Sequence, residues 1–233
     1  MADIPKVSKT NTNLEIINEE AGAAANQSRK ITAYLIAFLL ALSALLASTY
    51  LAHKQIMGPG EVKVFRHINN MPDSLKILGK ATSIAKNSTW IAVVAVVLAF
   101  AWRKWRLAWQ MAGSILAGYV VTFGLKHFIH RPRPAELLTG VHLRWSDTGA
   151  GFPSGHVMVV TVILLTLMPY LPKMWRWIVP VAGIGVVAWS RMYLGLHAPL
   201  DIVGGFAVGV GVVTFIHILP AKVSHFLRLN DVV

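Results

Sequence analysis

Apolar residues gather in six long runs that are separated by short polar stretches. The runs cover residues 31–52, 84–102, 107–129, 153–171, 175–192 and 199–219. Their lengths are close to the roughly 20 residues that an α-helix needs to cross the hydrocarbon core of a bilayer. The pattern therefore predicts an all-α, polytopic membrane protein with six transmembrane helices in one bundle, spanning residues 31–220.

The remaining segments are polar or mixed. Residues 1–30 predict a disordered or loosely helical cytoplasmic tail, and residues 221–233 a short cytoplasmic C-terminal tail. The N-terminal stretch is too long and too acidic for the start of a signal peptide, so the first apolar run is expected to be an uncleaved anchor. In residues 53–88, glycines and prolines interrupt the chain and lysines alternate with apolar residues, which predicts an interfacial segment that lies along the membrane surface.

Composition supports a membrane protein and excludes several other classes. The chain is 55% hydrophobic and only 14% charged, and it has a formal net charge of +12 and no cysteine. Without cysteine there are no disulfides, thiolate metal sites or cysteine nucleophiles. The basic residues are scattered between apolar runs and do not line one soluble face, which argues against nucleic acid as a partner. They favour topology signals and anionic lipid headgroups instead.

The basic residues also predict an orientation. With the N-terminus inside, the two short turns 103–106 ("RKWR") and 172–176 ("PKMWR") are cytoplasmic and rich in lysine and arginine. Positive charge is concentrated in short cytoplasmic loops. We therefore expect an inner-membrane protein with both termini in the cytoplasm. Five outer basic residues then need another explanation: Lys126, Arg131, Arg133, Arg144 and Arg191.

Three polar clusters fall on the outer side in this topology. They are "KHFIHRPRP" at 126–134, "FPSGH" at 152–156 and "SRMYLGLHAPLD" at 190–201. Each lies at one end of a predicted span, and six spans in this order bring all three to the same membrane face. Charged groups near the bilayer are costly and are usually functional. We expect one site built from the three clusters.

The second cluster resembles the start of a helix that binds an anion. With Pro153 at the first helical position, the amides of Ser154, Gly155 and His156 would belong to the unpaired donors of a helix N-terminus. Such a terminus binds phosphate. Gly155 would allow the anion to approach the backbone closely.

The third cluster pairs a histidine with a carboxylate. Pro199 predicts a helix start, which places His197 just outside the helix and Asp201 in its first turn. An aspartate on one imidazole nitrogen fixes the tautomer and leaves the other nitrogen free to attack. Lys126, Arg133 and Arg191 are three cations that we expect to converge on one phosphate.

Taken together, the clusters resemble a known signature. "KHFIHRPRP" fits K-x6-RP, "PSGH" fits directly, and "SRMYLGLHAPLD" fits SR-x5-H-x3-D. In this order they resemble the type 2 phosphatidic acid phosphatase and vanadium haloperoxidase superfamily, in its membrane lipid phosphatase branch. The motifs cover residues 126–201, and the six-span layout extends the resemblance over about 31–220.

The resemblance implies a role for each residue. His197 would be the nucleophile that forms a phosphohistidine, Asp201 would orient it, and His156 would protonate the leaving oxygen. The phosphoryl oxygens would be held by Lys126, Arg133, Ser154, Gly155 and Arg191. Neither a metal nor another cofactor would be needed, because cations of the protein stabilise the charge.

The resemblance implies a phosphorylated lipid as the substrate, namely undecaprenyl diphosphate as the first choice, or phosphatidylglycerol phosphate, phosphatidate or phosphorylated lipid A. Three alternatives stay open: a lipid phosphotransferase with the same site, a haloperoxidase, and a non-catalytic lipid-binding or transport component. Six spans argue against a haloperoxidase, because those enzymes are soluble. The outer-loop residues Arg144 and Trp145 are interpreted as an ordinary interfacial pair, with contact to a lipid headgroup as the less favoured alternative.

Overall fold

The computed structural model describes residues 7–81 and 88–230, and within them the chain is helical with no strand. The long helices are α1 (Val7–His53), α4 (Ser88–Ala101), α5 (Trp105–Ile129), α7 (Gly155–Leu167), α8 (Trp175–Tyr193) and α9 (Pro199–Asn230). The short ones are α2 (Pro59–Asn69), α3 (Lys76–Ala81) and α6 (Pro134–Leu137), with 3-10 turns at Asp73–Leu75 and Met168–Tyr170. The all-α class predicted from the sequence is confirmed.

The six long helices correspond to the six predicted runs, with shifted ends. The predicted start of the second run, 84–87, lies outside the described residues, and α4 is described from Ser88. Three stretches are long and apolar enough to cross a membrane: Ala21–His53, Trp105–Leu137 and Pro199–Leu219. The apolar helices Ser88–Ala101 and Gly155–Tyr170 are shorter. The structure thus supports a membrane protein, and the number of six spans remains a prediction.

Both ends of the chain continue as helix. Residues 7–30, for which we expected a disordered or loosely helical tail, are part of α1, which begins at Val7. Alanine and glutamate, both good helix formers, are frequent between residues 14 and 25. A helix that already exists also extends more easily than a new one nucleates. At the other terminus, α9 continues as far as Asn230.

Helix α7 is the centre of the bundle. It packs against α4, α5, α8 and α9, and its residues Val157, Met158, Val159 and Val162 are fully buried. Its start lies close to α9, where a Cβ atom on Gly205 would overlap the carbonyl oxygen of Ser154, the N-cap of α7. Large apolar side chains on α1, α4, α5 and α8 face outward, as expected for helices that contact lipid.

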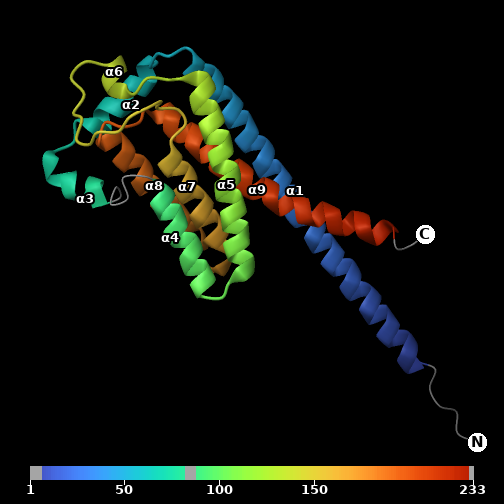
Figure 1. The fold of residues 1–233 in the computed structure, drawn as a ribbon. Coiled ribbons are helices and arrows are strands. Elements are labelled where there is room, and N and C mark those ends of the chain that lie inside the picture. Colours follow the sequence, from blue (N-terminus) through green and yellow to red (C-terminus); the bar gives the residue numbers. More distant parts are fainter. Residues whose placement is uncertain (1–6, 82–87, 231–233) are drawn as a thin grey trace, which may run out of the picture.

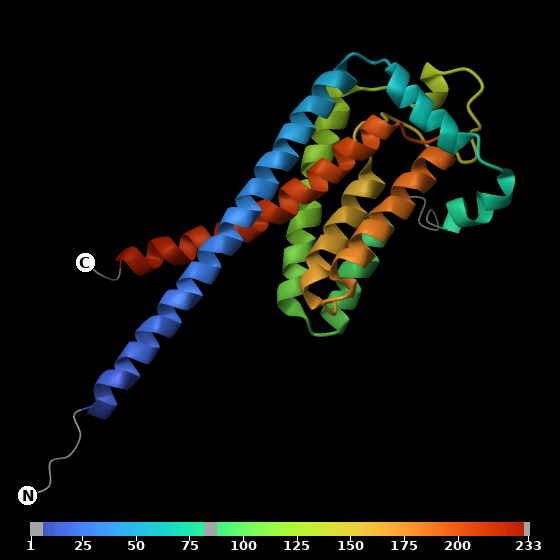
Figure 2. The same ribbon diagram turned by 180° about the vertical axis from the view of Figure 1, so that it is seen from behind.

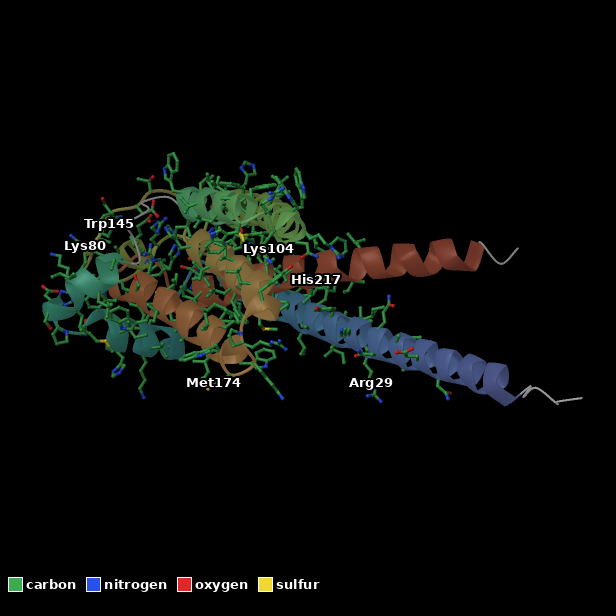
Figure 3. All side chains as sticks on the ribbon, turned by 90° about the horizontal axis from the view of Figure 1, so that it is seen from below. Arg29, Lys80, Lys104, Trp145, Met174 and His217 are labelled. Atoms are coloured by element: carbon green, nitrogen blue, oxygen red, sulfur yellow. The ribbon has the colours of Figure 1, made fainter. Side chains whose placement is uncertain are left out.

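The bundle has two different ends (Figure 1). Helices α2 and α6 lie at one end, together with the connection from α1, while the turn between α4 and α5 lies at the other. Helices α1 and α9 cross, and their free ends project away from the remaining helices (Figure 2). At this crossing the rings of Tyr34 and His217 are 5.0 Å apart, and His217 is labelled in Figure 3.

The first end is fixed by polar contacts to the loop 138–154, which precedes α7 and is the outer loop of the predicted topology. The Arg144 guanidinium donates to the carbonyls of Asn69 (2.7 Å), Met71 (2.9 Å) and Tyr193 (2.9 Å), and it pairs with Asp73. Arg144 therefore holds the loop against α2 and α8. These contacts favour the structural interpretation of this residue over contact with a lipid headgroup.

Trp145, the neighbour of Arg144, takes part in a second contact at this end. The Lys80 ammonium group lies 5.4 Å from the centre of the Trp145 ring (Figure 3). A cation over an aromatic face is attracted by the ring quadrupole. Helix α3 is thus also tied to the outer loop.

Candidate active site

A cavity of about 1020 Å³ opens at the same end of the bundle. Its wall contains predicted site residues from all three polar clusters: Lys126, Arg133, Gly155, His156 and His197. They come from the end of α5, the start of α6, the start of α7 and the loop between α8 and α9. The structure therefore brings most of the predicted residues to one place.

The cations of the first cluster are held by the outer loop. Lys126 donates to the carbonyl of Ala150. Arg133 donates to the carbonyls of Gly149 (3.0 Å), Leu196 (2.9 Å) and Thr148 (3.2 Å), and its Nη2 pairs with Asp147 at 3.0 Å. These contacts use four of the five guanidinium N–H groups. Arg133 offers a ligand mainly its charge and one remaining N–H.

The start of α7 differs from the prediction. The helix begins at Gly155 with Ser154 as its N-cap, so Pro153 is not the first helical residue. Ser154 has an extended backbone, and its N–H donates to the carbonyl of Asp201 at 3.0 Å. The Ser154 amide is thus occupied and cannot bind a phosphate. The first amide in the helix is that of Gly155, which lines the cavity beside His156.

Ser154 keeps a hydroxyl group that has no other use in the described part of the chain. The side chain is fully buried, and Oγ has no hydrogen-bond partner among the described residues. A buried hydroxyl without a partner is costly unless a ligand or water satisfies it. The expectation that Ser154 takes part in the site therefore rests on its side chain and not on its amide.

His197 and Asp201 lie together in the predicted order. Nδ1 of His197 is 3.5 Å from Oδ2 of Asp201, and both side chains are almost completely buried. This separation is long for a hydrogen bond, since N–H···O bonds are usually 2.7–3.2 Å. Oδ2 also accepts the N–H of Ala198 at 2.8 Å, which fixes the carboxylate. With Nδ1 directed at Asp201, Nε2 is the nitrogen available for attack.

The surroundings of His197 favour the neutral ring. Burial lowers the pKa of His197 to about 4, the nearby cations Arg133 and Lys126 lower it further, and Asp201 opposes the shift. A neutral imidazole keeps its lone pair at neutral pH. The site is thus suited to a nucleophilic histidine.

Arg191 lies deeper than expected. Its side chain is buried, and the residue is not part of the cavity wall as the structure describes it. Its carbonyl oxygen accepts the N–H groups of Leu196 (3.0 Å) and His197 (3.3 Å). The Arg191 backbone therefore holds the loop that carries His197. Contact between the Arg191 side chain and a phosphate stays a prediction.

Three residues at the site were not singled out from the sequence. Arg131 is fully buried and forms ion pairs with Glu61 (2.8 Å) and Asp201 (2.9 Å), and Asp147 pairs with Arg133. Glu61 stands in a segment that we interpreted only as interfacial, where it and Asp73 are the two carboxylates among several basic residues. The scarcity of carboxylates in this basic segment was the available signal.

The sequence profile of the PAP2 superfamily matches residues 107–224. This range is half of the chain, and it includes every residue of the three polar clusters. The chain belongs to the PAP2 superfamily. The resemblance that was drawn from the motifs is thereby confirmed.

Relatives that are similar in sequence to this chain are named as phosphatases. The chain is 31% identical over 121 residues to an undecaprenyl-diphosphatase of Sulfolobus acidocaldarius, which covers 52% of this chain and 58% of the relative. It is 27% identical over 153 residues to a putative undecaprenyl-diphosphatase of Escherichia coli, with 64% and 77% covered. The chain thus spans little more than half of the first relative.

The fold resembles that of a protein whose structure has been solved. The crystal structure of LpxE from Aquifex aeolicus superposes with a TM-score of 0.62 at 24% sequence identity, and the match covers 67% of this chain and 93% of that one. At this identity the likeness concerns the fold alone.

The cavity of this PAP2 protein has an apolar side as well as a cationic one. Trp90 of α4 and Phe123 of α5 line it and are 66% and 63% exposed. Between them, Tyr119 makes a hydrogen bond of 3.0 Å with Ser88. His127 and His130 also stand in the wall, next to Lys126, with their ring centres 5.6 Å apart. The cavity therefore suits a molecule with an anionic head and an apolar chain.

Proposed function

We propose that this protein is an integral membrane lipid phosphatase that hydrolyses a phosphomonoester or diphosphate of a lipid through a phosphohistidine. One observation carries the proposal. A single cavity combines two cations and four histidines with an aromatic wall on two apolar helices. The lipid chain would lie against α4 and α5 in the bilayer, and the phosphate would lie at the cationic end.

The proposed reaction has two steps. In the first, Nε2 of His197 attacks phosphorus, the bond from phosphorus to the leaving oxygen breaks, and His156 gives this oxygen a proton. In the second, water attacks the phosphohistidine, the P–N bond breaks and His156 takes a proton from the water. The ring of His197 becomes positive during attack, and Asp201 stabilises that charge as it holds Nδ1.

Five residues are proposed to hold the phosphoryl oxygens. Lys126 and Arg133 supply positive charge from the cavity wall, and Gly155 supplies a helix N-terminal amide. Ser154 would donate from its buried, otherwise unpartnered hydroxyl. Arg191 is the least direct, because it lies behind the wall and would act through its charge.

The proposed substrate is a lipid diphosphate, with undecaprenyl diphosphate as the first choice. Two similar relatives are named as undecaprenyl-diphosphatases, one of them putatively. The pair His127 and His130 adds two hydrogen-bonding groups to the cavity beyond those assigned to one phosphoryl group. We propose that they bind the second phosphate.

We further propose six spans, with the site on the extracytoplasmic side of the inner membrane and both termini in the cytoplasm. The basic turns at 103–106 and 172–176 support this orientation. The turn between α4 and α5 lies at the end opposite α2 and α6 (Figure 1). A reporter fused after Asn230 is expected to be cytoplasmic, and an extracytoplasmic reporter would contradict the orientation.

Phosphate release from a lipid panel tests the function. The purified protein in detergent with EDTA is given undecaprenyl diphosphate, phosphatidylglycerol phosphate, phosphatidate and phosphorylated lipid A. We expect release that survives chelation, is fastest with the diphosphate and disappears in His197→Ala. His67→Ala, which changes an exposed histidine of α2, is the control and should retain activity.

Other outcomes would change the proposal. Transfer of label from donor to acceptor lipid in place of free phosphate would identify a phosphotransferase. No release and no transfer from any lipid would contradict an enzyme and favour a lipid-binding role.

A further inference from the structure

Arg131 joins helix α2 to the start of α9 through two carboxylates. Its guanidinium binds Glu61 through two hydrogen bonds, Nη1 to Oε1 at 3.0 Å and Nη2 to Oε2 at 2.8 Å. The same Nη1 donates to Oδ1 of Asp201 at 2.9 Å. The Arg131 and Asp201 side chains are fully buried, and the Glu61 side chain is 13% exposed. Two carboxylates therefore share one buried arginine.

Backbone contacts fix the same group from both sides. Nη2 of Arg131 donates to the carbonyl of Ile56 at 3.0 Å, and Oε1 of Glu61 accepts the N–H of Leu200 at 3.0 Å. The other oxygen of Asp201 faces Nδ1 of His197. An unbroken series of contacts thus leads from the segment before α2 to the nucleophile.

The charges of this group indicate what Glu61 does. Asp201 and Arg131 alone would form a neutral pair, and Asp201 would then stabilise positive charge on His197 only weakly. Glu61 adds a second negative charge, so the group of Glu61, Arg131 and Asp201 carries one net negative charge. Interactions between buried charges are strong because the surroundings screen them poorly. The ring needs this charge when attack on phosphorus makes it positive.

We propose that Glu61 is a positioning residue for His197, which acts by balancing the charge of Arg131 so that Asp201 stays effective. The inference rests on the proposed phosphatase reaction. Glu61 lies outside the matched range 107–224 and is not part of the cavity wall as described, so it acts on the reaction without touching substrate.

The test compares charge variants of the full-length protein. Glu61→Gln keeps the shape of the side chain and an acceptor for Leu200 but removes the charge. We expect kcat and the rate of phosphoenzyme formation to fall about 10- to 100-fold. Losses of this size are typical when a residue that orients a metal-binding side chain is replaced, and Glu61 would support His197 in a comparable way. KM for the lipid and inhibition by inorganic phosphate should stay within about twofold. Asp73→Asn removes another carboxylate that is paired with an arginine, and it should leave kcat unchanged.

Two further variants separate charge from shape. Combining Glu61→Gln with Arg131→Gln restores one net negative charge at Asp201, so kcat should recover to within about tenfold of wild type. Glu61→Asp keeps the charge and should lose less activity than Glu61→Gln. Thermal unfolding in detergent shows which variants fold, and if Glu61→Gln does not, the double variant decides.

The inference is wrong if Glu61→Gln has the kcat of wild type, or if Glu61→Asp and Glu61→Gln lower kcat equally. It is also wrong if the double variant is as slow as a folded Glu61→Gln, or more than tenfold slower than wild type. Each of these results requires an active wild-type enzyme. A wild type that releases no phosphate from any lipid would instead contradict the proposed function.

Discussion

The guanidinium of Arg133 donates to the carbonyl oxygen of Leu196 at 2.9 Å, and Leu196 directly precedes His197 in the chain. The contact joins the first polar cluster to the third, over 63 residues of sequence. It fixes the Arg133 guanidinium next to the backbone that carries His197, the nucleophile of the proposed reaction.

Arg133→Lys should reduce kcat/KM about 100-fold or more, because lysine keeps the charge but loses the fork that holds the loop and the one N–H that remains for the transition state. Steady-state kinetics with the preferred lipid measures the change. Arg66→Lys is the control, since Arg66 makes one carbonyl contact with Thr139 at the same end of the bundle. Equal effects of the two substitutions would argue against a role for Arg133 in the reaction.

The acid side of the pH profile should extend well below the usual range of histidine. The pKa of His197 is lowered to about 4, so the folded protein keeps the ring neutral while the ring in the unfolded chain, with its pKa near 6.5, takes up a proton. Protonation of His197 should therefore not reduce kcat/KM until the pH approaches 4. The folded state should also lose stability as the pH falls from about 6.5 toward 4.

The measurement is kcat/KM from pH 4 to 8 with a lipid diphosphate whose own titration is determined separately in the same detergent. A fall of kcat/KM on the acid side with a midpoint near pH 6.5, after correction for titration of the substrate, would contradict the lowered pKa of His197.

Gly205→Ala should destabilise the protein by about 1–3 kcal/mol, because the new Cβ atom would overlap the carbonyl of Ser154 and push α9 away from α7. Thermal unfolding in detergent checks this. Gly211→Ala, on the same helix, is the control, since its nearest neighbour would be the Cβ atom of Ala41 at 4.0 Å. Equal melting temperatures for the two variants would disprove the close approach.

Arg144→Ala should lower stability by at least about 2 kcal/mol, because the carbonyls of Asn69, Met71 and Tyr193 lose a charged donor. The ratios of KM between different lipids should not change. Asp73→Asn should have a much smaller effect, since the Asp73 side chain is 74% exposed. A change in preference among headgroups would revive direct contact between Arg144 and the lipid.

The sequence predicted the parts of this structure that depend on local pattern. Apolar runs of about 20 residues indicated the long helices, and the motif spacings indicated that His156, His197 and Lys126 share one cavity. The hydrogen-bond partner of each polar group could not be predicted in the same way. Whether the Ser154 amide is free depends on Asp201, which is 47 positions away in the chain and is brought close by the packing of α7 on α9.

The same reason explains why Glu61 and Arg131 were missed. Their ion pair joins residues 70 positions apart and requires α2 to lie against the connection between α5 and α6. From the sequence, Arg131 was one more arginine in a basic cluster, and Glu61 belonged to a segment predicted to lie on the membrane surface. No periodicity or motif links the two positions.

Trapping of the phosphoenzyme tests the central claim most directly. Wild type and His197→Ala are mixed with undecaprenyl diphosphate labelled at its terminal phosphate, in the presence of EDTA, and quenched within milliseconds in alkali. We predict a phosphoprotein in the wild type that is stable in alkali and labile in acid, as expected for phosphohistidine, and no labelled protein in His197→Ala. Label that persists in the variant, or steady turnover without any labelled protein in the wild type, would contradict His197 as the nucleophile.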